Sequence, residues 1–410
     1  MAEAFLVAGI GRSMESRGPA LKPGVPTVLQ VLPSLVTGGV ERGACDMARA
    51  IEAAGLNAVV MSSGGPMADA LVPEGIRHIQ APVAAKNPLT IWRNAGRIAR
   101  VADAVGAGII HARSRAPAWS AWLAARRLGR PFVTTFHGTY NFHGPLKRRY
   151  NSVMARGDRV IAISQFIADH IAAHYDCPAD RVRVIHRGID TGDFDSASVA
   201  PARLEALRAQ WALRGVESDG RRGVVMLPAR LARWKGHAVL IAAMAEVDAL
   251  AVMVGGGTDG YRAEMEALAE RLGVADRVRF VGDCRDMPAA YALADLVVSA
   301  STDPEAFGRV AVEAQAMARP VIASAHGASP ETVIDLAARP DAGTGWLVPP
   351  DDPAALAAAL TQALALPAEA RAAIGDRGRA NARARFSREA MCAATLAVYA
   401  ELDPAIAARL

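Results

Sequence analysis

Short apolar runs alternate along most of the chain with longer amphipathic stretches rich in alanine. Apolar runs of about four to eight residues are typical of buried strands, whereas apolar residues about three or four positions apart are typical of helices. In the first half the pattern predicts strands at 27–32, 58–62, 108–111, 131–136, 159–163 and 183–186, and helices at 40–54, 88–104, 116–128, 146–155 and 165–175. This alternation indicates βα units around a parallel sheet.

The same alternation begins again after a turn-rich segment at 187–198 (RGIDTGDFDSAS), which we interpret as a linker. The second half has predicted strands at 223–228, 249–254, 278–281, 295–299 and 320–323, and predicted helices at 236–246, 258–272, 308–318, 354–364, 367–385 and 387–402. We therefore predict the α/β class, with two doubly wound, Rossmann-like halves. Such sheets bind ligands beside the carboxyl ends of their strands, so we expect the halves to face each other across a cleft.

The predicted elements divide the chain into four parts. Residues 26–195 form one Rossmann-like domain, and residues 196–385 form the other. Residues 1–25 are expected to be a poorly ordered leader, because their apolar patch lacks the basic start and the cleavage site of a signal peptide. Residues 386–410 hold the last predicted helix.

The composition is that of a globular protein. Of the 410 residues, 52% are apolar and 21% are charged, which excludes disorder or a fibre for the chain as a whole. The four cysteines lie far apart in the sequence, a spacing that argues against a disulfide framework or a structural zinc site. No apolar run reaches the roughly 18–20 residues of a membrane span. We therefore expect a cytoplasmic protein.

Basic residues are concentrated in the first half. Residues 1–195 contain 23 Lys and Arg against 15 Asp and Glu, whereas the remainder contains 23 against 26. Basic surfaces attract phosphates on nucleic acids, anionic membranes or phosphorylated glycolipids, although a solvated basic face explains the charge equally well. Aromatic residues make up only 5% of the chain and no stacking motif accompanies the charge, which disfavours nucleic acid as a partner.

Two glycine clusters follow predicted strands. Gly38 and Gly39 precede the first helix, and Gly255, Gly256 and Gly257 follow the strand at 249–254. Glycine in these positions lets backbone N–H groups approach a phosphate, but tight βα turns need glycine as well. Neither cluster reads GxGxxG, so a dinucleotide cofactor is not indicated.

Two cations follow another predicted strand. Arg230 and Lys235 lie in the segment 228–236 (PARLARWKG), before a helix. Two cations at a cleft edge suit a diphosphate, and an exposed basic loop is the alternative. Asp193 and Asp195 have the DxD spacing of a divalent-metal site but follow no apolar strand, so we expect no metal there.

Two glutamates and a histidine complete the candidates. Glu305 lies in the loop 305–308 (EAFG) and Glu313 in the helix that follows. A separation of eight residues, about 12 Å of helix, suits opposite ends of an elongated ligand, although solvated glutamates are common on helices. His137 directly follows a predicted strand, where a neutral imidazole can bond a ligand hydroxyl, and His111 is a weaker candidate of the same kind.

Taken in order, these segments resemble retaining glycosyltransferases of the GT-B fold, in the large family 4 that includes many lipopolysaccharide and exopolysaccharide enzymes. The resemblance covers nearly the whole chain. It rests on Gly38–Arg42 (GGVER), Phe136–Gly138 (FHG), Arg230-Leu231 with Lys235-Gly236, Gly255–Gly257, Glu305–Gly308 with Glu313, Gly327 with Glu331, and Gly345–Pro350 (GWLVPP). It implies an acceptor-side first domain, a nucleotide-sugar-binding second domain, and a last helix that crosses back to the first.

The resemblance also implies roles in donor binding. Arg230 and Lys235 would bind the donor diphosphate and stabilise the charge on the leaving nucleotide. Gly256 would lie on the donor as well. Because cations and a helix N-terminus supply the positive field, such enzymes need neither a metal nor a cofactor.

Four residues of the EAFG segment and its helix have implied roles of their own. Glu305 would hold the transferred sugar together with the backbone around Phe307 and Gly308. Glu313 would accept hydrogen bonds from the ribose hydroxyls.

In the first domain the resemblance implies that Gly38 and Gly39 lie against the diphosphate and that His137 contacts the donor sugar. One departure is close by. Family members often read Asn-Gly before the linker, where this chain has Arg187-Gly188.

The function implied is transfer of a hexose from a nucleotide-diphosphate sugar to a hydroxyl of an anionic glycan or glycolipid, with retention, in lipopolysaccharide core or polysaccharide synthesis. The segment RLARWKG with FHGTY is similar to core transferases, some of which use GDP-mannose. Contact with the cytoplasmic membrane face is part of this expectation. Alternatives are a nucleotide-sugar 2-epimerase of the same fold and a non-catalytic protein that binds nucleotides or anionic surfaces.

Overall fold

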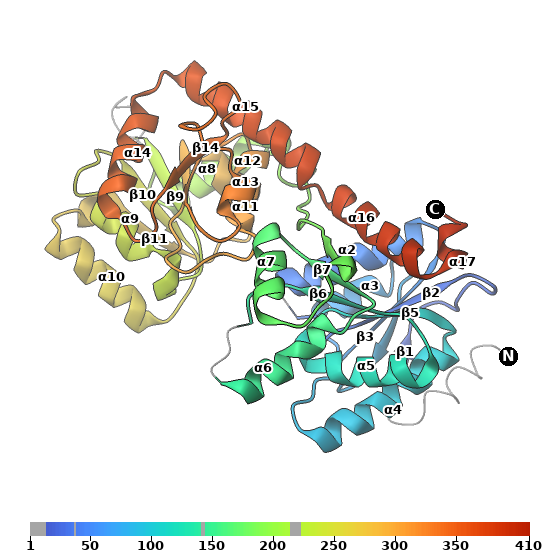
Figure 1. The fold of residues 1–410 in the computed structure, drawn as a ribbon. Coiled ribbons are helices and arrows are strands. Elements are labelled where there is room, and N and C mark those ends of the chain that lie inside the picture. The colour runs from blue at the N-terminus through green and yellow to red at the C-terminus, as the bar shows by residue number, and fades with distance from the viewer. Residues whose placement is uncertain (1–13, 37, 141–143, 214–222) are drawn as a thin grey trace. The chain divides into compact units, whose positions relative to one another are not determined.

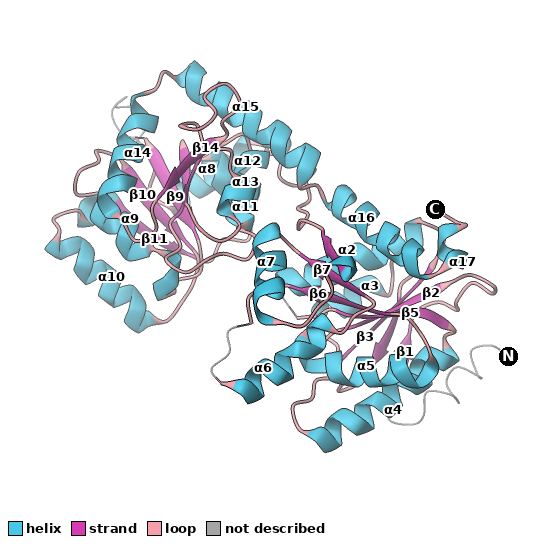
Figure 2. Cartoon of the chain, in the orientation of Figure 1, coloured by secondary structure: helices cyan, strands magenta, loops and turns pink. Residues whose placement is uncertain are grey.

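The computed structural model describes residues 14–36, 38–140, 144–213 and 223–410. The chain forms two compact units. The first consists of Met1–Gly188 with Arg388–Leu410, and the second of Ile189–Ser387. Figure 1 shows the course of the chain, and Figure 2 shows that each unit has a sheet with helices packed around it.

The first unit contains a sheet of strand order β1-β4-β3-β2-β5-β6-β7-β8. All neighbouring strands are parallel except β1 and β4. The strands are β1 (Glu15–Arg17), β2 (Thr27–Val31), β3 (Asn57–Ser62), β4 (Arg77–Gln80), β5 (Ala107–Ala112), β6 (Phe132–Phe136), β7 (Arg159–Ala162) and β8 (Val182–Val184). β2 and β3 are buried along their full length, which explains why most of their residues are apolar.

The first unit contains the helices between β2 and β8 and, in addition, the two helices that follow the second unit in sequence. They are α2 (Gly39–Ala53), α3 (Pro66–Leu71), α4 (Pro88–Ala104), α5 (Arg115–Leu128), α6 (Pro145–Asn151), α7 (Gln165–His174), α16 (Arg388–Leu402) and α17 (Pro404–Ala407). α16 packs against α2, and Cys392 and Tyr399 share a hydrophobic cluster with Met47 and Ile51. Residues of α16 therefore complete the hydrophobic core of the first unit, to which α2 also contributes.

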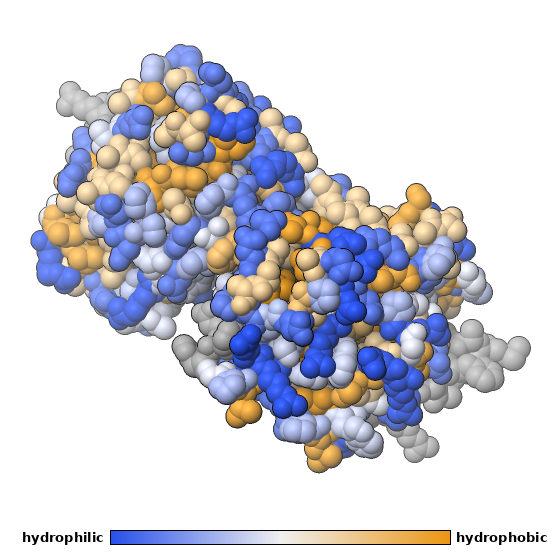
Figure 3. Space-filling view, viewed as in Figure 1, coloured by the Kyte–Doolittle hydropathy of each residue, from blue (hydrophilic) through white to orange (hydrophobic). Residues whose placement is uncertain are grey.

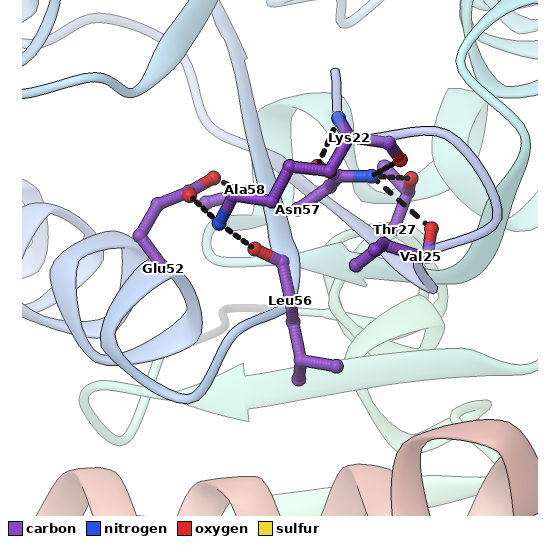
Figure 4. Close-up of polar contacts among 7 residues, drawn as sticks. All are labelled: Lys22, Val25, Thr27, Glu52, Leu56, Asn57 and Ala58. Atoms are coloured by element: carbon purple, nitrogen blue, oxygen red, sulfur yellow. Dashed lines mark hydrogen bonds and ion pairs between the residues drawn. The ribbon is translucent and has the colours of Figure 1, made fainter. Parts of the chain in front are cut away.

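The leader expected at residues 1–25 is wrong from Met14 onward, and the residues before Met14 lie outside the described part. Strand β1 pairs with β4 at the sheet edge. The Asn57 side chain accepts a hydrogen bond from the Lys22 N–H at 2.9 Å and donates to the carbonyls of Lys22 and Val25 (Figure 4). This segment is therefore fixed to the first unit by strand pairing and by a buried amide.

The second unit contains a sheet of strand order β11-β10-β9-β12-β13-β14, in which all neighbouring strands are parallel. The strands are β9 (Val224–Pro228), β10 (Leu250–Val254), β11 (Val278–Gly282), β12 (Leu296–Ser299), β13 (Val321–Ser324) and β14 (Gly345–Val348). The helices are α8 (Pro201–Gln210), α9 (His237–Ala243), α10 (Asp259–Arg271), α11 (Met287–Ala292), α12 (Arg309–Ala316), α13 (Ser329–Thr332), α14 (Pro353–Ala365) and α15 (Ala368–Arg385). Leu240, Leu296 and Leu360 belong to a hydrophobic cluster of this unit, so each unit has its own core.

In both sheets the strand order reverses at one point. The first unit builds outward from β2 to β4 and then returns to place β5 beside β2. The second unit builds outward from β9 to β11 and then returns to place β12 beside β9. At such switch points the loops diverge from the carboxyl ends of adjacent strands and leave room for a ligand.

The predicted α/β class with two Rossmann-like sheets is confirmed, and every predicted strand and helix occurs close to its expected position. The pattern missed β1, β4, β14, α3, α8, α11, α13 and α17. The chain passes between the units at Gly188 and Ile189, inside the segment interpreted as a linker. Within the described ranges, no helix has the length and apolar character that a membrane span requires.

Candidate active site

Lys235 and Glu305 meet at the switch point of the second unit. Lys235 ends a short 3₁₀ turn in the loop after β9, and Glu305 lies in the loop after β12. Lys235 Nζ forms an ion pair with Glu305 Oε1, and Ser301 Oγ donates a hydrogen bond to the same oxygen at 2.7 Å. The two charged side chains are only 18% and 17% exposed. A cation and a carboxylate are thus held together where doubly wound sheets bind ligands.

A glycine explains why the two loops lie so close. Gly236 has a left-handed φ of 76°, and a side chain there would collide with the carbonyl of Ala300, just after β12. The N–H of Thr302 donates to the carbonyl of Trp234 at 2.8 Å. The loop after β9 therefore lies directly on the end of β12.

A second glycine supports the loop that carries Glu305. The N–H of Ala328 donates to the Glu305 carbonyl at 2.9 Å, and His326 Nε2 donates to the carbonyl of Ser301 at 2.8 Å. Gly327 has a φ of 59°, and a side chain there would lie 2.7 Å from the Glu305 nitrogen. Gly327 thus lets its loop pack against Glu305 and support the position of this residue.

Arg230 and Gly256 lie on neighbouring loops of the same sheet edge. Arg230 is exposed, and its guanidinium forms no hydrogen bond or ion pair with any residue that the structure describes. The N–H of Gly256 donates to Asp283 Oδ1 at 2.7 Å, and its carbonyl accepts from the N–H of Leu231 at 2.8 Å. Arg230 is therefore available to an anion, whereas the N–H of Gly256 already has a carboxylate partner.

Glu313 is a buried carboxylate, and both of its oxygens accept hydrogen bonds from neighbouring side chains. Arg309 Nη2 donates to Glu313 Oε1 at 2.7 Å, and the Tyr291 hydroxyl donates to Oε2 at 2.9 Å. Burial and the charge of Glu313 raise the pKa of Tyr291 well above its ordinary value, so the phenol keeps its proton. Hydroxyls of a ribose would add to these bonds or replace one of them.

Phe307 and Gly308 directly precede the N-terminus of α12. Gly308 caps this helix of eight residues with a left-handed φ of 75°. The Phe307 ring is buried and packs edge-on against Phe386, with ring centroids 5.7 Å apart. Only the main chain of this segment is therefore left to meet a ligand, with the positive end of the helix dipole beside it.

In the first unit, Gly39 and His137 come together around Arg187. His137 Nδ1 accepts a hydrogen bond from Arg187 Nη1 at 3.3 Å. A side chain at Gly39 would lie 3.2 Å from Arg187 Nη2, and Gly38, with a φ of 133°, precedes α2. Burial, with Arg187 and Arg113 nearby, lowers the pKa of His137 well below its ordinary value, so the ring is neutral.

The weaker candidates have structural partners. His111 Nδ1 lies 2.7 Å from the Tyr399 hydroxyl and Nε2 lies 2.8 Å from Thr135 Oγ1, so both ring nitrogens are bonded in the core. Asp195 of the DFD segment accepts from Arg383 Nη2 at 2.8 Å. Within the part of the chain that the structure describes, no group of three His, Cys, Asp or Glu side chains is arranged to hold a metal ion.

Sequence reasoning missed the residues that hold these groups in place. Ser301, Tyr291, His326 and Asp283 belong to none of the sequence motifs. Tyr291, His326 and Asp283 bond to residues of another loop or helix, and Ser301 bonds to Glu305 four residues later in its own loop. Arg187 was noted only as a departure from the family pattern. Its place as the first residue of the predicted linker was the single local signal.

Models of two protein families together match most of the chain. The model described as Glycosyltransferase Family 4 matches residues 37–193, within the first unit apart from its last few residues. The model described as Glycosyl transferases group 1 matches residues 213–381, within the second unit.

The chain is also similar to a glycosyltransferase of known structure from Rickettsia africae, with 33% identity and a TM-score of 0.83, over 92% of this chain and 99% of that one. A structure of Anabaena Alr3699/HepE in complex with UDP and glucose has 26% identity and a TM-score of 0.75, over 92% and 99% of the two chains. A curated relative from Salinispora tropica, the D-inositol 3-phosphate glycosyltransferase, is 34% identical over 68% of this chain. That match covers 61% of the relative, so the chain spans about three fifths of its length.

The two sheets and these matches define a GT-B glycosyltransferase. The chain belongs to the glycosyltransferases that join a family 4 N-terminal domain to a group 1 domain, as its motifs predicted.

Proposed function

We propose that this glycosyltransferase moves a hexose from a nucleotide-diphosphate sugar to a hydroxyl of an anionic glycan or glycolipid, with retention of configuration. The observation that carries the proposal is the group of charges at the switch point of the second unit. Arg230 has no partner among the residues that the structure describes, Lys235 is paired with Glu305, and the N-terminus of α12 lies after the same loop. In a diphosphate complex, these positive groups would stabilise the negative charge of the leaving nucleotide.

The pairing of Glu305 supports a mechanism without an enzyme nucleophile. Its carboxylate oxygen Oε1 is held by Lys235 and by Ser301, which restricts its freedom to attack a sugar. In the proposed reaction the acceptor oxygen bonds to the anomeric carbon on the face from which the diphosphate leaves. A phosphate oxygen of the leaving group takes the acceptor's proton. The positive groups take the place of a metal, so we propose that no metal is needed.

The identity of the donor base has two lines of support. The HepE structure in complex with UDP and glucose, 26% identical to this chain, favours a UDP-sugar. The similarity of RLARWKG and FHGTY to core transferases favours GDP-mannose. Both bases are therefore included in the test.

Thermal unfolding with UDP and with GDP, in EDTA and in magnesium, tests the proposal on wild type, Lys235→Met and Arg233→Met. One nucleotide should raise the melting temperature of the wild type equally with and without magnesium, because it binds only the folded state. Lys235→Met should lose most of this shift. Arg233 is the matched control, since its side chain is 77% exposed and pairs with Glu264 at 2.7 Å.

Three outcomes would contradict the proposal. Equal shifts in both variants would mean that the nucleotide does not use Lys235. A shift that requires magnesium would exclude metal independence. Conversion of a UDP-sugar or of GDP-mannose to another sugar nucleotide without an acceptor would favour the 2-epimerase.

We also propose that the first unit docks on the cytoplasmic face of a membrane that holds a glycolipid acceptor of lipopolysaccharide synthesis. Leu89 and Trp92 on α4 are 68% and 72% exposed, and Trp92 lines a pocket with Arg93, Arg97 and Arg100. Figure 3 shows hydrophobic areas beside hydrophilic ones over this part of the unit. An aromatic ring among cations suits an anionic interface.

Sedimentation with vesicles tests this docking. Wild type should bind vesicles that contain phosphatidylglycerol, and Trp92→Ser with Arg97→Gln should bind at least several-fold less. Neutral phosphatidylcholine vesicles provide the control. Equal binding of the variant and the wild type would remove α4 from the proposed surface.

A further inference from the structure

Arg113 is a buried cation of the first unit. It directly follows β5, at the switch point, and is only 4% exposed. Its Nε is buried without a hydrogen bond, and its guanidinium has no hydrogen bond or ion pair with any residue in the described ranges. A buried charge that is left unpaired keeps the desolvation penalty of an ion. This penalty destabilises the folded state unless a ligand compensates the charge.

Arg187 brings a second guanidinium to the same place. A side chain at Gly43 of α2 would lie 3.1 Å from Arg113 Nη2 and 3.2 Å from Arg187 Nη2, so both cations lie against this one glycine. Both line a small pocket whose lining holds no carboxylate. The charge of Asp46 raises the pKa of Arg113, but burial is the larger effect and lowers it. The lining of the pocket therefore contains two arginines and no acidic side chain.

His137 contributes a third donor. Arginine can only donate, so the bond from Arg187 Nη1 makes His137 Nδ1 the acceptor. The ring is neutral, and its proton must then sit on Nε2. This Nε2–H is buried and has no hydrogen-bond partner among the described residues. His137 lines the same pocket as the two arginines.

We propose that this pocket binds an oxyanion of the acceptor, a phosphoryl or carboxylate group, through Arg113, Arg187 and His137 Nε2–H. The inference rests on the proposed function and adds the chemical class of the acceptor. Guanidinium groups bind such oxyanions through two parallel N–H bonds, and a neutral imidazole adds a third donor without a further charge. Helix α2, of 15 residues, begins with Gly39 beside Arg187 and adds its positive dipole end.

The test is thermal unfolding with inorganic phosphate, at constant ionic strength in chloride, on wild type, Arg113→Gln and Arg130→Gln. Phosphate should raise the melting temperature of the wild type saturably, and Arg113→Gln should lose at least two thirds of that shift. Arg130 is exposed near the end of α5 and outside the pocket, so its variant should keep the full shift. Without phosphate, Arg113→Gln should be at least as stable as the wild type, because it removes an unpaired buried charge.

A second substitution keeps the proposal testable if Arg113→Gln does not fold. Gly43→Ala keeps both arginines but presses a methyl group on their Nη2 atoms, so phosphate should bind at least several-fold more weakly. An unchanged phosphate shift in either folded variant would overturn the proposal. A lower melting temperature of Arg113→Gln without phosphate would make the residue structural and overturn it as well.

Adding the donor nucleotide distinguishes an oxyanion of the acceptor from the diphosphate of the donor as the occupant of the pocket. If the acceptor provides it, the phosphate shift should persist with saturating UDP or GDP, and Arg113→Gln should bind the nucleotide as the wild type does. Loss of the phosphate shift with nucleotide would assign the pocket to the donor diphosphate and overturn the acceptor assignment. A phosphate shift in a protein that binds neither nucleotide would sink the proposed function but leave the pocket as an oxyanion site. Repeating the thermal-unfolding titration with gluconate in place of phosphate shows whether the pocket also binds a carboxylate.

Discussion

At the scale of single residues, the site depends on glycines as much as on charges. Gly236 and Gly327 both adopt left-handed backbone and both let one loop lie on another. The charged pair that they bring together, Lys235 with Glu305, draws one partner from each loop. A sequence motif thus contains charged residues of the candidate site and glycines that only make room for them.

Gly236→Ala tests this division. The substitution forces a Cβ into left-handed backbone and onto the Ala300 carbonyl, so we expect a loss of about 2 kcal/mol or more in the free energy of unfolding of the second unit. Nucleotide binding should weaken with it, because Lys235 is the preceding residue. Chemical denaturation followed by intrinsic fluorescence measures the first, and the same experiment with nucleotide added measures the second.

Gly260→Ala is the matched control for that substitution. Gly260 lies in the first turn of α10 with open space where a Cβ would be, so alanine should be neutral or stabilise by up to about 1 kcal/mol. A Gly236→Ala variant as stable as Gly260→Ala would show that the close approach of the two loops is not required.

At the scale of elements, the sequence predicts what is long and periodic and misses what is short. β4 reads RHIQ and β1 reads ESR, and neither has an apolar run that marks a strand. Both pair because the neighbouring strand offers free backbone groups at the edge, a cause that lies outside their own sequence. α8 was missed because its polar residues are spread around the helix with no clear apolar face.

The same limit applies to the candidate site. Position after a strand correctly placed Arg230, Lys235 and Glu305 at one sheet edge, because the carboxyl ends of parallel strands meet there. The i,i+4 pair of Arg309 and Glu313 within α12 could be read from the sequence, but the hydrogen bond from Tyr291 of α11 to Glu313 could not. Side-chain pairing across loops depends on register and packing, which a single sequence does not specify locally.

At the scale of the whole molecule, the first unit is discontinuous in sequence. Its core contains residues of α2, near the start of the chain, and of α16, near its end. Tyr399 of α16 is fully buried and its hydroxyl lies 2.7 Å from His111 Nδ1 in β5. The first unit therefore cannot complete its core until the second has been synthesised.

Tyr399→Ala should therefore destabilise the first unit, although the residue follows the second in sequence. Loss of a fully buried aromatic ring costs about 3–5 kcal/mol, whereas Tyr399→Phe removes only the hydrogen bond and should cost about 1 kcal/mol. Hydrogen exchange read by mass spectrometry reports the two units separately. Faster exchange is expected in β2, β5 and α2, with β9 and β12 unchanged. If Tyr399→Ala instead loosened only the second unit, α16 would have to belong to that unit in solution.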